Sequence, residues 1–383
     1  MQELAEELTR RKHKVSVVTS YPQYNLADEM KGKSFDEYSI ENEIEVLRIR
    51  TMPHHKVNLI IRGIAQLSMP YIFLSKIRRH LKQGFDIVIV YSPPLPLANI
   101  GRILKKKNNA KFILNIQDIF PQNAIDLGAL KNSFIIRYFE HMEKKAYEHA
   151  DAVTVHSHGN KQFLLSKKRI SEEKLHVLHN WIDLSPYSNI KADNYFRGKY
   201  ALENKFIILF AGVIGPSQGL DMVIKAATKL GNISDLCFLI VGDGTEKDRL
   251  MRIVKDYQLK NVIFKPFVSK DDYPKLVKEA NVGLVCLTSL NKTPVVPGKI
   301  LGYMGAAIPV LAFLNKESDG HQIIREAQCG YSEISNDYKK IVDSVIKIYN
   351  ERDQLREYGN NGYKYVATHF EKSKCIDKLE KLF

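Results

Sequence analysis

The sequence has no long run of uncharged apolar residues, and this absence bears on whether the protein spans a membrane. Nowhere among its 383 residues do about 18 consecutive apolar residues occur, so we expect no membrane-spanning helix. The opening residues from Met1 to Leu4 are already polar, and we therefore expect no secretory signal peptide. The composition, 44% hydrophobic and 26% charged, is typical of a globular protein and excludes a disordered or fibrous one.

The sequence also lacks the motifs that are typical of metal sites and of paired cysteines. The twelve histidines show no H-x-x-x-H pair and no D-x-D motif occurs, so we expect no metal and no other cofactor. A G-x-S-x-G nucleophile elbow is also absent. The four cysteines are scattered without a C-x-x-C pair, and we expect reduced, buried thiols that suit a reducing cytosol: Cys237, Cys286, Cys329 and Cys375.

Acidic residues are too few to balance the basic ones, and the formal net charge is +14. Such an excess favours anionic partners, among them nucleic acids, anionic membrane surfaces and phosphorylated small molecules. The excess is spread over both halves of the chain and is not gathered in a basic tail. This distribution argues against a nucleic-acid-binding arm, and we expect no nucleic-acid partner.

Short, β-branched apolar segments alternate with amphipathic segments along the whole chain. Their apolar residues occupy both faces, as in parallel strands covered by helices, and residues 219–230 show helical spacing. The pattern predicts an α/β protein with open parallel sheets. The predicted strands are Lys14–Ser20, Ile87–Tyr91, Lys111–Ile116, Ala152–His156, Phe206–Ala211, Leu236–Val241, Val262–Phe264, Val282–Cys286 and Ile308–Leu311.

A polar stretch near residues 184–203 separates two such halves, and single cores rarely exceed about 250 residues. We therefore predict two domains, residues 1–185 and 186–367, with a cleft between them. A final helix over residues 368–383 is expected to pack back on the first domain. No strand precedes the helix-like start, so we expect the first strand of the first domain to be missing; a naturally short start is the alternative.

Two glycine-rich loops follow predicted strands in the second half. Glycines let a phosphate approach the backbone, and a following helix offers free N–H groups. Neither loop is a G-x-G-x-x-G motif, so a dinucleotide site is poorly supported, and tight turns explain each loop equally well. The candidate donor-binding residues of these loops are Gly212, Gly215, Ser217, Gln218, Gly242 and Gly244.

A third candidate is the segment Thr293–Ile300, which places Pro297-Gly298-Lys299 ahead of a predicted helix. The segment is not a P-loop, because it has threonine where the first glycine is needed and isoleucine where a hydroxyl would bind magnesium. The backbone at Gly298 and the Lys299 ammonium can still hold a phosphate. A solvated lysine after a turn would give the same pattern.

The first half offers a polar strand end and a basic, apolar segment. Asp118 follows a predicted strand, where its carboxylate is placed for a ligand hydroxyl; a helix cap or structural hydrogen bond is the alternative. Residues 57–81 are apolar and suit a membrane interface, with a core helix as the alternative. The basic cluster that ends this segment is Lys76, Arg78, Arg79 and Lys82.

Taken in order, these motifs resemble a family-4 retaining glycosyltransferase with the GT-B fold. The subgroup that the chain most resembles builds O-antigen and capsule repeats and includes N-acetyl-fucosamine transferases. No single motif is decisive, but their order spans nearly the whole chain. The motifs are Tyr91-Ser92-Pro93-Pro94, Gln117-Asp118-Ile119-Phe120-Pro121, residues 140–153, residues 179–183, Ala211-Gly212 to Gln218-Gly219, Val241-Gly242-Asp243-Gly244, Pro297-Gly298-Lys299 to Tyr303-Met304, and Pro309-Val310.

The resemblance implies a GT-B fold of two Rossmann-like domains, with the donor in the C-terminal domain and the acceptor in the N-terminal one. Lys299 and Asp118 are then the catalytic candidates: the lysine stabilises the departing diphosphate and the carboxylate orients a sugar hydroxyl. Phe267 is a candidate wall for the donor, beside Gly242 and Gly244. Ser92 and Pro93 are expected on the acceptor side.

Four positions depart from the family pattern. Val213 and Gln218 stand where members often carry basic residues for the diphosphate. Gly302 stands where members carry the glutamate that binds the ribose, and Pro294 stands at the partner position of that glutamate. Lys299 therefore becomes the main candidate cation for the diphosphate.

The activity implied by the resemblance is retaining transfer of a sugar from a nucleoside diphosphate, UDP-linked, to a lipid-linked saccharide. It belongs to O-antigen, capsule or lipopolysaccharide synthesis by a cytoplasmic protein, peripheral on the inner face of the cell membrane. Two alternatives are kept open. One is a UDP-sugar 2-epimerase of the same fold, and the other is a non-catalytic protein that binds sugar nucleotides or membranes.

Overall fold

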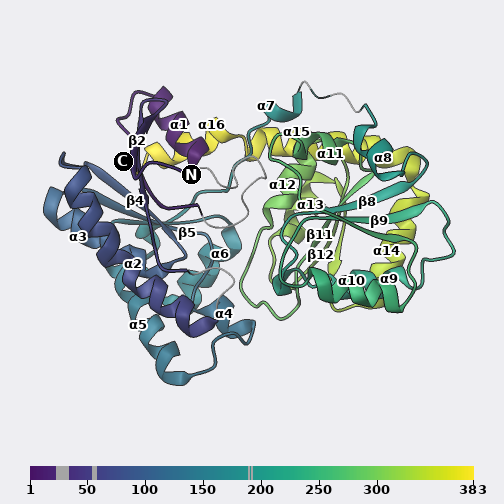
Figure 1. The fold of residues 1–383 in the computed structure, drawn as a ribbon, viewed down its shortest axis with the longest axis horizontal. Coiled ribbons are helices and arrows are strands. Elements are labelled where there is room, and N and C mark those ends of the chain that lie inside the picture. Colours follow the sequence, from purple (N-terminus) through teal and green to yellow (C-terminus); the bar gives the residue numbers. More distant parts are fainter. Residues whose placement is uncertain (23–33, 54–57, 189, 191–192) are drawn as a thin grey trace. The chain divides into compact units, whose positions relative to one another are not determined.

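The computed structural model describes residues 1–22, 34–53, 58–188, 190 and 193–383, which form two compact units (Figure 1). The first unit comprises residues 1–156, 161–178 and 375–383, and the second comprises residues 157–160 and 179–374. The chain passes from one to the other a few residues before the expected boundary at 185. Each unit is described by itself below.

The first unit contains two sheets. In the three-stranded sheet, β1 pairs parallel to β3 and β2 pairs antiparallel to β3, while the second sheet is parallel in the order β4-β5-β6-β7. The strands are β1 (Ser16–Ser20), β2 (Tyr38–Glu41), β3 (Ile44–Ile49), β4 (Ile87–Ser92), β5 (Lys111–Ile116), β6 (Ala152–Val155) and β7 (Leu175–Val177). The helices that begin in this part of the chain are α1 (Gln2–Arg10), α2 (Leu59–His80), α3 (Ala98–Asn108), α4 (Gln122–Asp126) and α5 (Ser133–His149).

The last helix, α16 (Lys372–Glu380), ends in the first unit. Arg11, which follows α1, forms ion pairs with Asp377 and Glu380, at N–O distances of 2.5 Å. The two ends of the described chain are therefore joined within one unit.

The second unit is built on one parallel sheet of six strands in the order β10-β9-β8-β11-β12-β13. Its strands are β8 (Phe206–Ala211), β9 (Leu236–Val241), β10 (Val262–Lys265), β11 (Val282–Cys286), β12 (Val310–Leu314) and β13 (Gly330–Ile334). The remaining helices are α6 (His158–Phe163), α7 (Ser185–Ser188), α8 (Tyr195–Tyr200), α9 (Asp221–Ala227), α10 (Lys247–Asp256), α11 (Tyr273–Lys278), α12 (Gly298–Gly305), α13 (Gly320–Ala327), α14 (Tyr338–Asn350) and α15 (Leu355–His369).

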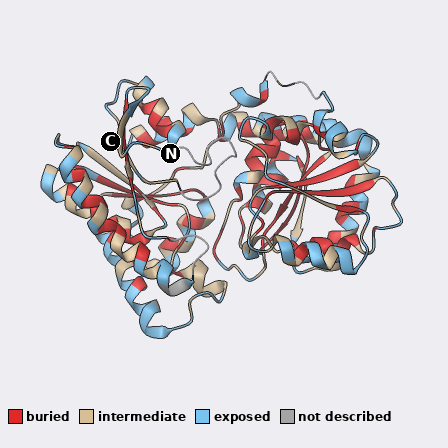
Figure 2. Cartoon of the chain, viewed as in Figure 1, coloured by how far each residue is buried: buried red, intermediate tan, exposed pale blue. Residues whose placement is uncertain are grey.

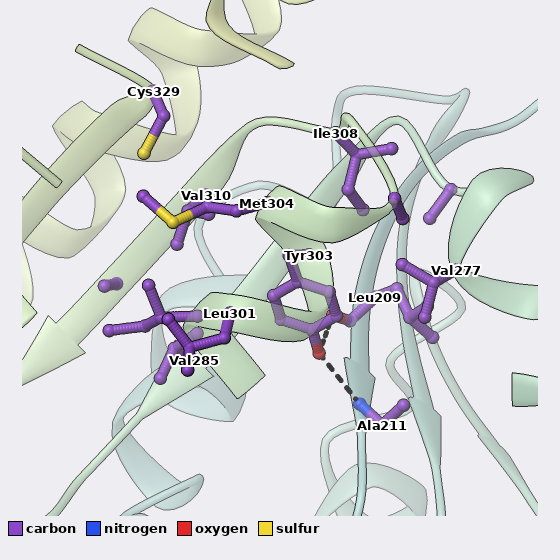
Figure 3. Packing of buried hydrophobic residues seen from close by; sticks show 14 of the residues in the cluster. Leu209, Ala211, Val277, Val285, Leu301, Tyr303, Met304, Ile308, Val310 and Cys329 are labelled. Atoms are coloured by element: carbon purple, nitrogen blue, oxygen red, sulfur yellow. Dashed lines mark hydrogen bonds between the residues drawn. The ribbon is translucent and has the colours of Figure 1, made fainter. Parts of the chain in front are cut away.

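The core of the second unit lies on both faces of this sheet (Figure 2). Every residue of β8 is buried, and its side chains alternate between two clusters, with Leu209 in one and Phe210 in the other. Tyr303 of α12 is completely buried, and its hydroxyl accepts from Ala211 N (3.2 Å) and donates to Leu209 O (3.0 Å) (Figure 3). These two hydrogen bonds connect α12 to the central strand β8 of the sheet.

Most predicted strands are confirmed, and four have the predicted bounds: β5, β8, β9 and β11. The predicted helix over residues 219–230 is shorter, because Gly219 adopts a φ of +61° and α9 begins only at Asp221. The sequence analysis missed β2, β3, β7 and β13. The β2–β3 hairpin turns through Asn42 and Glu43, both with positive φ, where glycine would have signalled the turn.

All four cysteines are free and buried, as expected. Among the helices of the described residues, none combines the length and apolarity needed to cross a bilayer.

Candidate functional site

The strand order of the second unit reverses at one place, where the loops after two neighbouring strands diverge. From β8 the chain adds β9 and then β10 on one side, and then places β11, β12 and β13 on the other. In open parallel sheets, ligands bind at the carboxyl ends of the strands where the order reverses in this way. Here that place lies between the loops that follow β8 and β11. Thr288 N after β11 donates to Ser217 O after β8, at 2.9 Å.

Lys299 lies at this place, in the first turn of α12. Its Nζ donates to Gln218 Oε1 at 3.0 Å and lies 4.8 Å from the centroid of the Phe210 ring. Burial lowers the pKa of the Lys299 ammonium to about 8. Within the described residues, no carboxylate forms an ion pair with this ammonium. The arrangement holds a poorly hydrated cation that an anionic ligand would stabilise.

The absence of a side chain at Gly212 leaves the space that the Lys299 side chain occupies. Its φ is +146°, and a Cβ atom at this position would lie 2.7 Å from Lys299 Cε. Any larger residue would therefore displace the lysine side chain. The glycine therefore leaves room for the Lys299 side chain, and its expected contact with a phosphate stays a prediction.

Gly242 and Gly244 lie where the loop after β9 packs against the loop after β8. A Cβ on Gly242 would lie 1.9 Å from Gly212 O, and one on Gly244 would lie 2.2 Å from Ile214 O. Ile214 N also donates to Asp243 O at 2.8 Å. The side of each glycine that lacks a side chain thus faces the loop after β8. This close approach of backbone explains why both positions are glycine, and their assignment to the donor site stays a prediction.

Gly215 and Gly298 are more open. Nothing lies within 4 Å of a Cβ added at Gly298, and only Val213 Cγ1, at 3.9 Å, lies near one added at Gly215. Pro297 precedes α12 and provides no side-chain cap for the first N–H groups of the helix. Those N–H groups lie beside Lys299 and suit an anion, because helix N-termini carry partial positive charge.

Three polar side chains hold the segment that leads into α12. Asn160 Nδ2 donates to Pro294 O, Asn315 Nδ2 donates to Thr293 O at 3.2 Å, and Ser318 Oγ donates to Val295 O. Asn160 and Asn315 are buried, so these bonds are shielded from water. The sequence analysis missed all three donors, since they come from distant segments and form no motif.

Gly302 lies one turn further along α12 and is buried. A Cβ at this position would lie 2.9 Å from the hydroxyl oxygen of Tyr273 and 3.6 Å from that of Tyr187. Burial raises the pKa of Tyr273 and keeps it a neutral phenol. Phenol groups therefore lie next to the position where family members carry a glutamate and this chain has glycine.

Phe267 lies in the loop after β10, and 51% of its surface is exposed. An exposed ring can form the wall of a ligand site, and the assignment to the donor stays a prediction.

In the first unit, the carboxyl ends of β4 and β5 are adjacent. Ser92 is buried and pairs with Ile116, Gln117 N donates to Ser92 O at 2.8 Å, and the following Pro93 is exposed. Asp118 reaches solvent after β5, yet loss of hydration among its neighbours raises the pKa of its carboxyl.

The predicted basic cluster lies at the end of α2 and just beyond it, and one of its four residues forms an ion pair. Lys76 Nζ forms an ion pair with Glu37 at 2.7 Å, and His80 Nε2 lies 2.8 Å from the same carboxylate. Lys76 is therefore paired within the first unit, and its place on the acceptor or membrane side stays a prediction. Arg78, Arg79 and Lys82 remain exposed. Val57, where the expected segment begins, lies outside the described residues.

Two family profiles match the chain, one for each half. The profile described as "Glycosyltransferase Family 4" matches residues 1–186, and the one described as "Glycosyl transferases group 1" matches residues 193–365. A putative colanic acid biosynthesis glycosyl transferase, WcaI of Escherichia coli K12, is 27% identical over 78% of this chain and 74% of its own length. The probable glycosyltransferase WbjE of Pseudomonas aeruginosa is 24% identical over 77% of this chain and 74% of its own length.

Solved structures share the architecture. Sucrose-phosphate synthase from Thermosynechococcus elongatus superposes with a TM-score of 0.78 at 16% identity, covering 100% of this chain and 91% of its own. The lipopolysaccharide glycosyltransferase WaaG gives 0.67 at 14% identity, covering 100% and 94%. Together with the two parallel-sheet units, these likenesses confirm the predicted GT-B fold.

Proposed function

We propose that the chain, whose two halves match the two glycosyltransferase family profiles, moves a sugar from a UDP-linked donor to a lipid-linked saccharide. The transfer retains the configuration at the anomeric carbon and contributes to a cell-surface polysaccharide. The observation that carries the proposal is the partly buried Lys299 ammonium at the point where the strand order reverses.

Catalysis in this proposal depends on the negative charge that the leaving diphosphate gains. Breaking the bond between the anomeric carbon and the diphosphate leaves negative charge on the diphosphate oxygens, and groups fixed beforehand stabilise it best. In this proposal Lys299 and the first N–H groups of α12 meet that charge. The bonds from Asn160 and Asn315 hold the segment before α12 in place, so little reorganisation is needed when the donor arrives. Asp118 orients a sugar hydroxyl from the first unit.

The substrate classes are supported by relatives. A HepE structure from Anabaena, determined in complex with UDP and glucose, superposes with a TM-score of 0.73 at 14% identity over 99% of this chain and 93% of its own. A Campylobacter jejuni relative, 27% identical over 55% of this chain and 54% of its own length, is named for transfer of N-acetylgalactosamine to a saccharide on diphospho-undecaprenol. These names support a UDP-sugar donor and a polyprenyl-linked acceptor; N-acetyl-fucosamine remains one candidate sugar.

The test begins with donor binding. We would measure thermal stabilisation of the full chain by UDP, GDP and dTDP and by their sugars, because a ligand at 100 times its Kd adds about 2.7 kcal/mol to unfolding. UDP-linked compounds should stabilise the protein, and the Lys299→Met variant should lose the effect. Transfer to a polyprenyl-diphosphate saccharide should then give a product with the donor's anomeric configuration by NMR. If no nucleotide stabilises the protein, the donor site is misassigned; an inverted product refutes retention, and turnover without an acceptor favours the epimerase.

A further inference from the structure

Strand β13 lies at one edge of the six-stranded sheet of the second unit, and among the described strands it pairs with β12 alone. The register places Val310 beside Gly330, and Val310 N donates to Cys329 O at 2.8 Å. Val310 therefore bonds to the two residues that flank Gly330, and in a parallel ladder this pattern repeats at every second residue. The intervening residues of β13 direct their backbone N–H and C=O groups toward the open edge: Gly330, Ser332 and Ile334.

Most of these outward groups have no partner in the part of the chain that the structure describes. Ile334 O accepts from Asp337 N at 3.1 Å, and no other hydrogen bond between described residues reaches the outward groups. The Ser332 hydroxyl is directed to helix α13, where it lies 3.0 Å from His321 Nδ1, so it leaves the edge uncovered. A row of unpaired backbone groups can receive another extended chain.

A groove of about 670 Å³ follows this edge, and all five residues of β13 line it. Its two walls come from opposite faces of the sheet, because α13 packs in the core cluster on one face and α14 in the cluster on the other. Ile324 and Arg325 of α13 line the first wall, and Lys340 of α14 and Tyr358 of α15 line the second. Five extended residues span about 17 Å, so the groove has the length of a short strand.

The groove carries more positive than negative charge. Three cationic side chains line it, and Glu333 is the one carboxylate among its described lining residues. Glu333 already forms an ion pair with Lys340 Nζ, at 3.8 Å. Lys316 and Arg325 are exposed, and neither forms an ion pair with a described residue. These two charges favour an acidic occupant, and they would repel the same edge of a second copy of this chain.

Two tyrosine rings add apolar surface to the second wall. The hydroxyl oxygens of Tyr331 and Tyr358 lie 3.0 Å apart, and both groups donate to Glu351 Oε2, at 2.7 Å and 3.1 Å. Successive side chains of a strand point to opposite faces. A strand added to this edge would therefore present every second side chain to Lys316 and Arg325, and the others to the two rings.

We propose that β13 binds an extended acidic segment of a partner protein, which pairs with the open edge as an added strand. The backbone of the segment bonds to the outward N–H and C=O groups, and acidic side chains at every second position meet Lys316 and Arg325. Apolar side chains at the intervening positions meet Tyr331 and Tyr358. In strand addition the backbone provides affinity, and the alternate side chains provide specificity.

A peptide fits this edge better than an acidic saccharide does. Both could pair with the cations, but only an extended backbone repeats donors and acceptors at the spacing of the outward groups of β13. The inference goes beyond the proposed function and does not depend on it, because it uses no residue of the candidate donor site.

The experiment measures binding of a fluorescent peptide to the full chain by fluorescence anisotropy. The peptide has about eight residues, the length of an ordinary strand, with glutamate and valine in alternation. It should bind, and hydrogen exchange of the Ser332 and Ile334 N–H groups should slow in the complex. A peptide with lysine in place of glutamate should not bind measurably.

Two N-methylated forms of the peptide separate strand pairing from attraction between charges. One carries the methyl groups on the glutamates and the other on the valines, so each lacks one alternate set of N–H donors. Alternate N–H groups of a strand point to opposite sides, so only one set can face β13. One form should therefore bind at least about ten-fold more weakly than the parent peptide, since it loses several hydrogen bonds, while the other should bind nearly as the parent does.

Variants of the chain test the charges and the edge separately. Lys316→Gln/Arg325→Gln should weaken binding about ten-fold, because each exposed ion pair contributes a few-fold in affinity. Ile334→Pro removes one outward N–H at an edge position, where proline is tolerated, and should also weaken binding. The matched control Arg252→Gln/Lys255→Gln removes one arginine and one lysine from exposed positions on α10 and should bind as the native chain does. Thermal unfolding with and without UDP should be the same for every variant as for the native chain, so a failure here stays distinguishable from a failure of the donor site.

Any of the following results would overturn the inference. The acidic peptide fails to bind the native chain, or the lysine peptide binds equally well. Both N-methylated forms bind as the parent peptide does, which would reduce the groove to a charged patch; this comparison uses the native chain and holds even where Ile334→Pro fails to fold. The Lys316→Gln/Arg325→Gln variant binds as well as the native chain. An oligogalacturonate binds where the acidic peptide does not, which would identify a saccharide site.

Discussion

Replacing Lys299 by methionine should stabilise the free protein while removing its activity. Burial lowers the pKa of this ammonium from 10.5 to about 8, so the folded state binds the proton less tightly than the unfolded state does. Below pH 8 both states are protonated and the folded state carries the whole cost of the buried charge. Between pH 8 and 10.5 the folded state releases its proton first, and stability rises with pH.

The magnitude follows from the size of that shift. A difference of about 2.5 pKa units corresponds to roughly 3 kcal/mol at neutral pH. Methionine has similar length without charge, and it gives up the hydrogen bond to Gln218, which contributes about 1 kcal/mol. We expect Lys299→Met to raise the free energy of unfolding by roughly 2 kcal/mol, or about 4–8 °C in Tm for a unit of this size.

The assay combines thermal unfolding at pH 7 and pH 10 with turnover. The stabilisation by methionine should be largest at pH 7 and should shrink at pH 10, where the native lysine is mostly neutral in the folded state. Turnover should fall about 10²- to 10³-fold, as when one charge-stabilising donor is removed. Lys255→Met, at an exposed position on α10, should change neither quantity. A destabilised Lys299→Met variant, or one with near-native turnover, would refute the reasoning.

Three further predictions concern metal, α12 and the segment before it. EDTA should leave the transfer rate unchanged; inhibition that magnesium or manganese reverses would contradict this. Gly302→Ala should lower stability by about 1–3 kcal/mol, because its Cβ meets the Tyr273 hydroxyl, and adding Tyr273→Phe should recover most of the loss in calorimetry; additive losses would show that the contact is not the cause. Asn160→Ala should leave the buried Pro294 carbonyl unpaired, cost about 1–3 kcal/mol, and raise the KM for the donor more than it lowers kcat; an unchanged KM would contradict a positioning role.

The strands of the second unit could be predicted because burial leaves a simple signal. A strand covered on both faces is apolar throughout, and β8, β9 and β11 are buried at every position. The hairpin of β2 and β3 gives no such signal, since β2 has no buried residue and its turn lacks glycine. Local patterns therefore identify the strands that are buried throughout, whereas a partly exposed hairpin such as β2–β3 can escape them.

One part of the candidate site could be predicted from the sequence, and another part could not. The position of Lys299 after Pro297-Gly298 is local and was visible in the sequence. Its environment was not, because Gly212 and Gln218 approach it from a loop more than 80 residues away in the chain. The bonds from Asn160 and Asn315 were equally hidden, since an asparagine that holds a distant carbonyl has no spacing of its own.

The contact between the loops after β8 and β9 has a consequence for mutational scanning. A library screened for polysaccharide production would find Gly242 and Gly244 as intolerant of change as Lys299, and all three would be read as one active site. The causes differ, because each glycine lies against a backbone carbonyl that no side chain can displace. Measuring the abundance of folded protein alongside the phenotype separates them. The glycine variants should disappear from the cell, whereas the lysine variants should accumulate as intact, inactive protein.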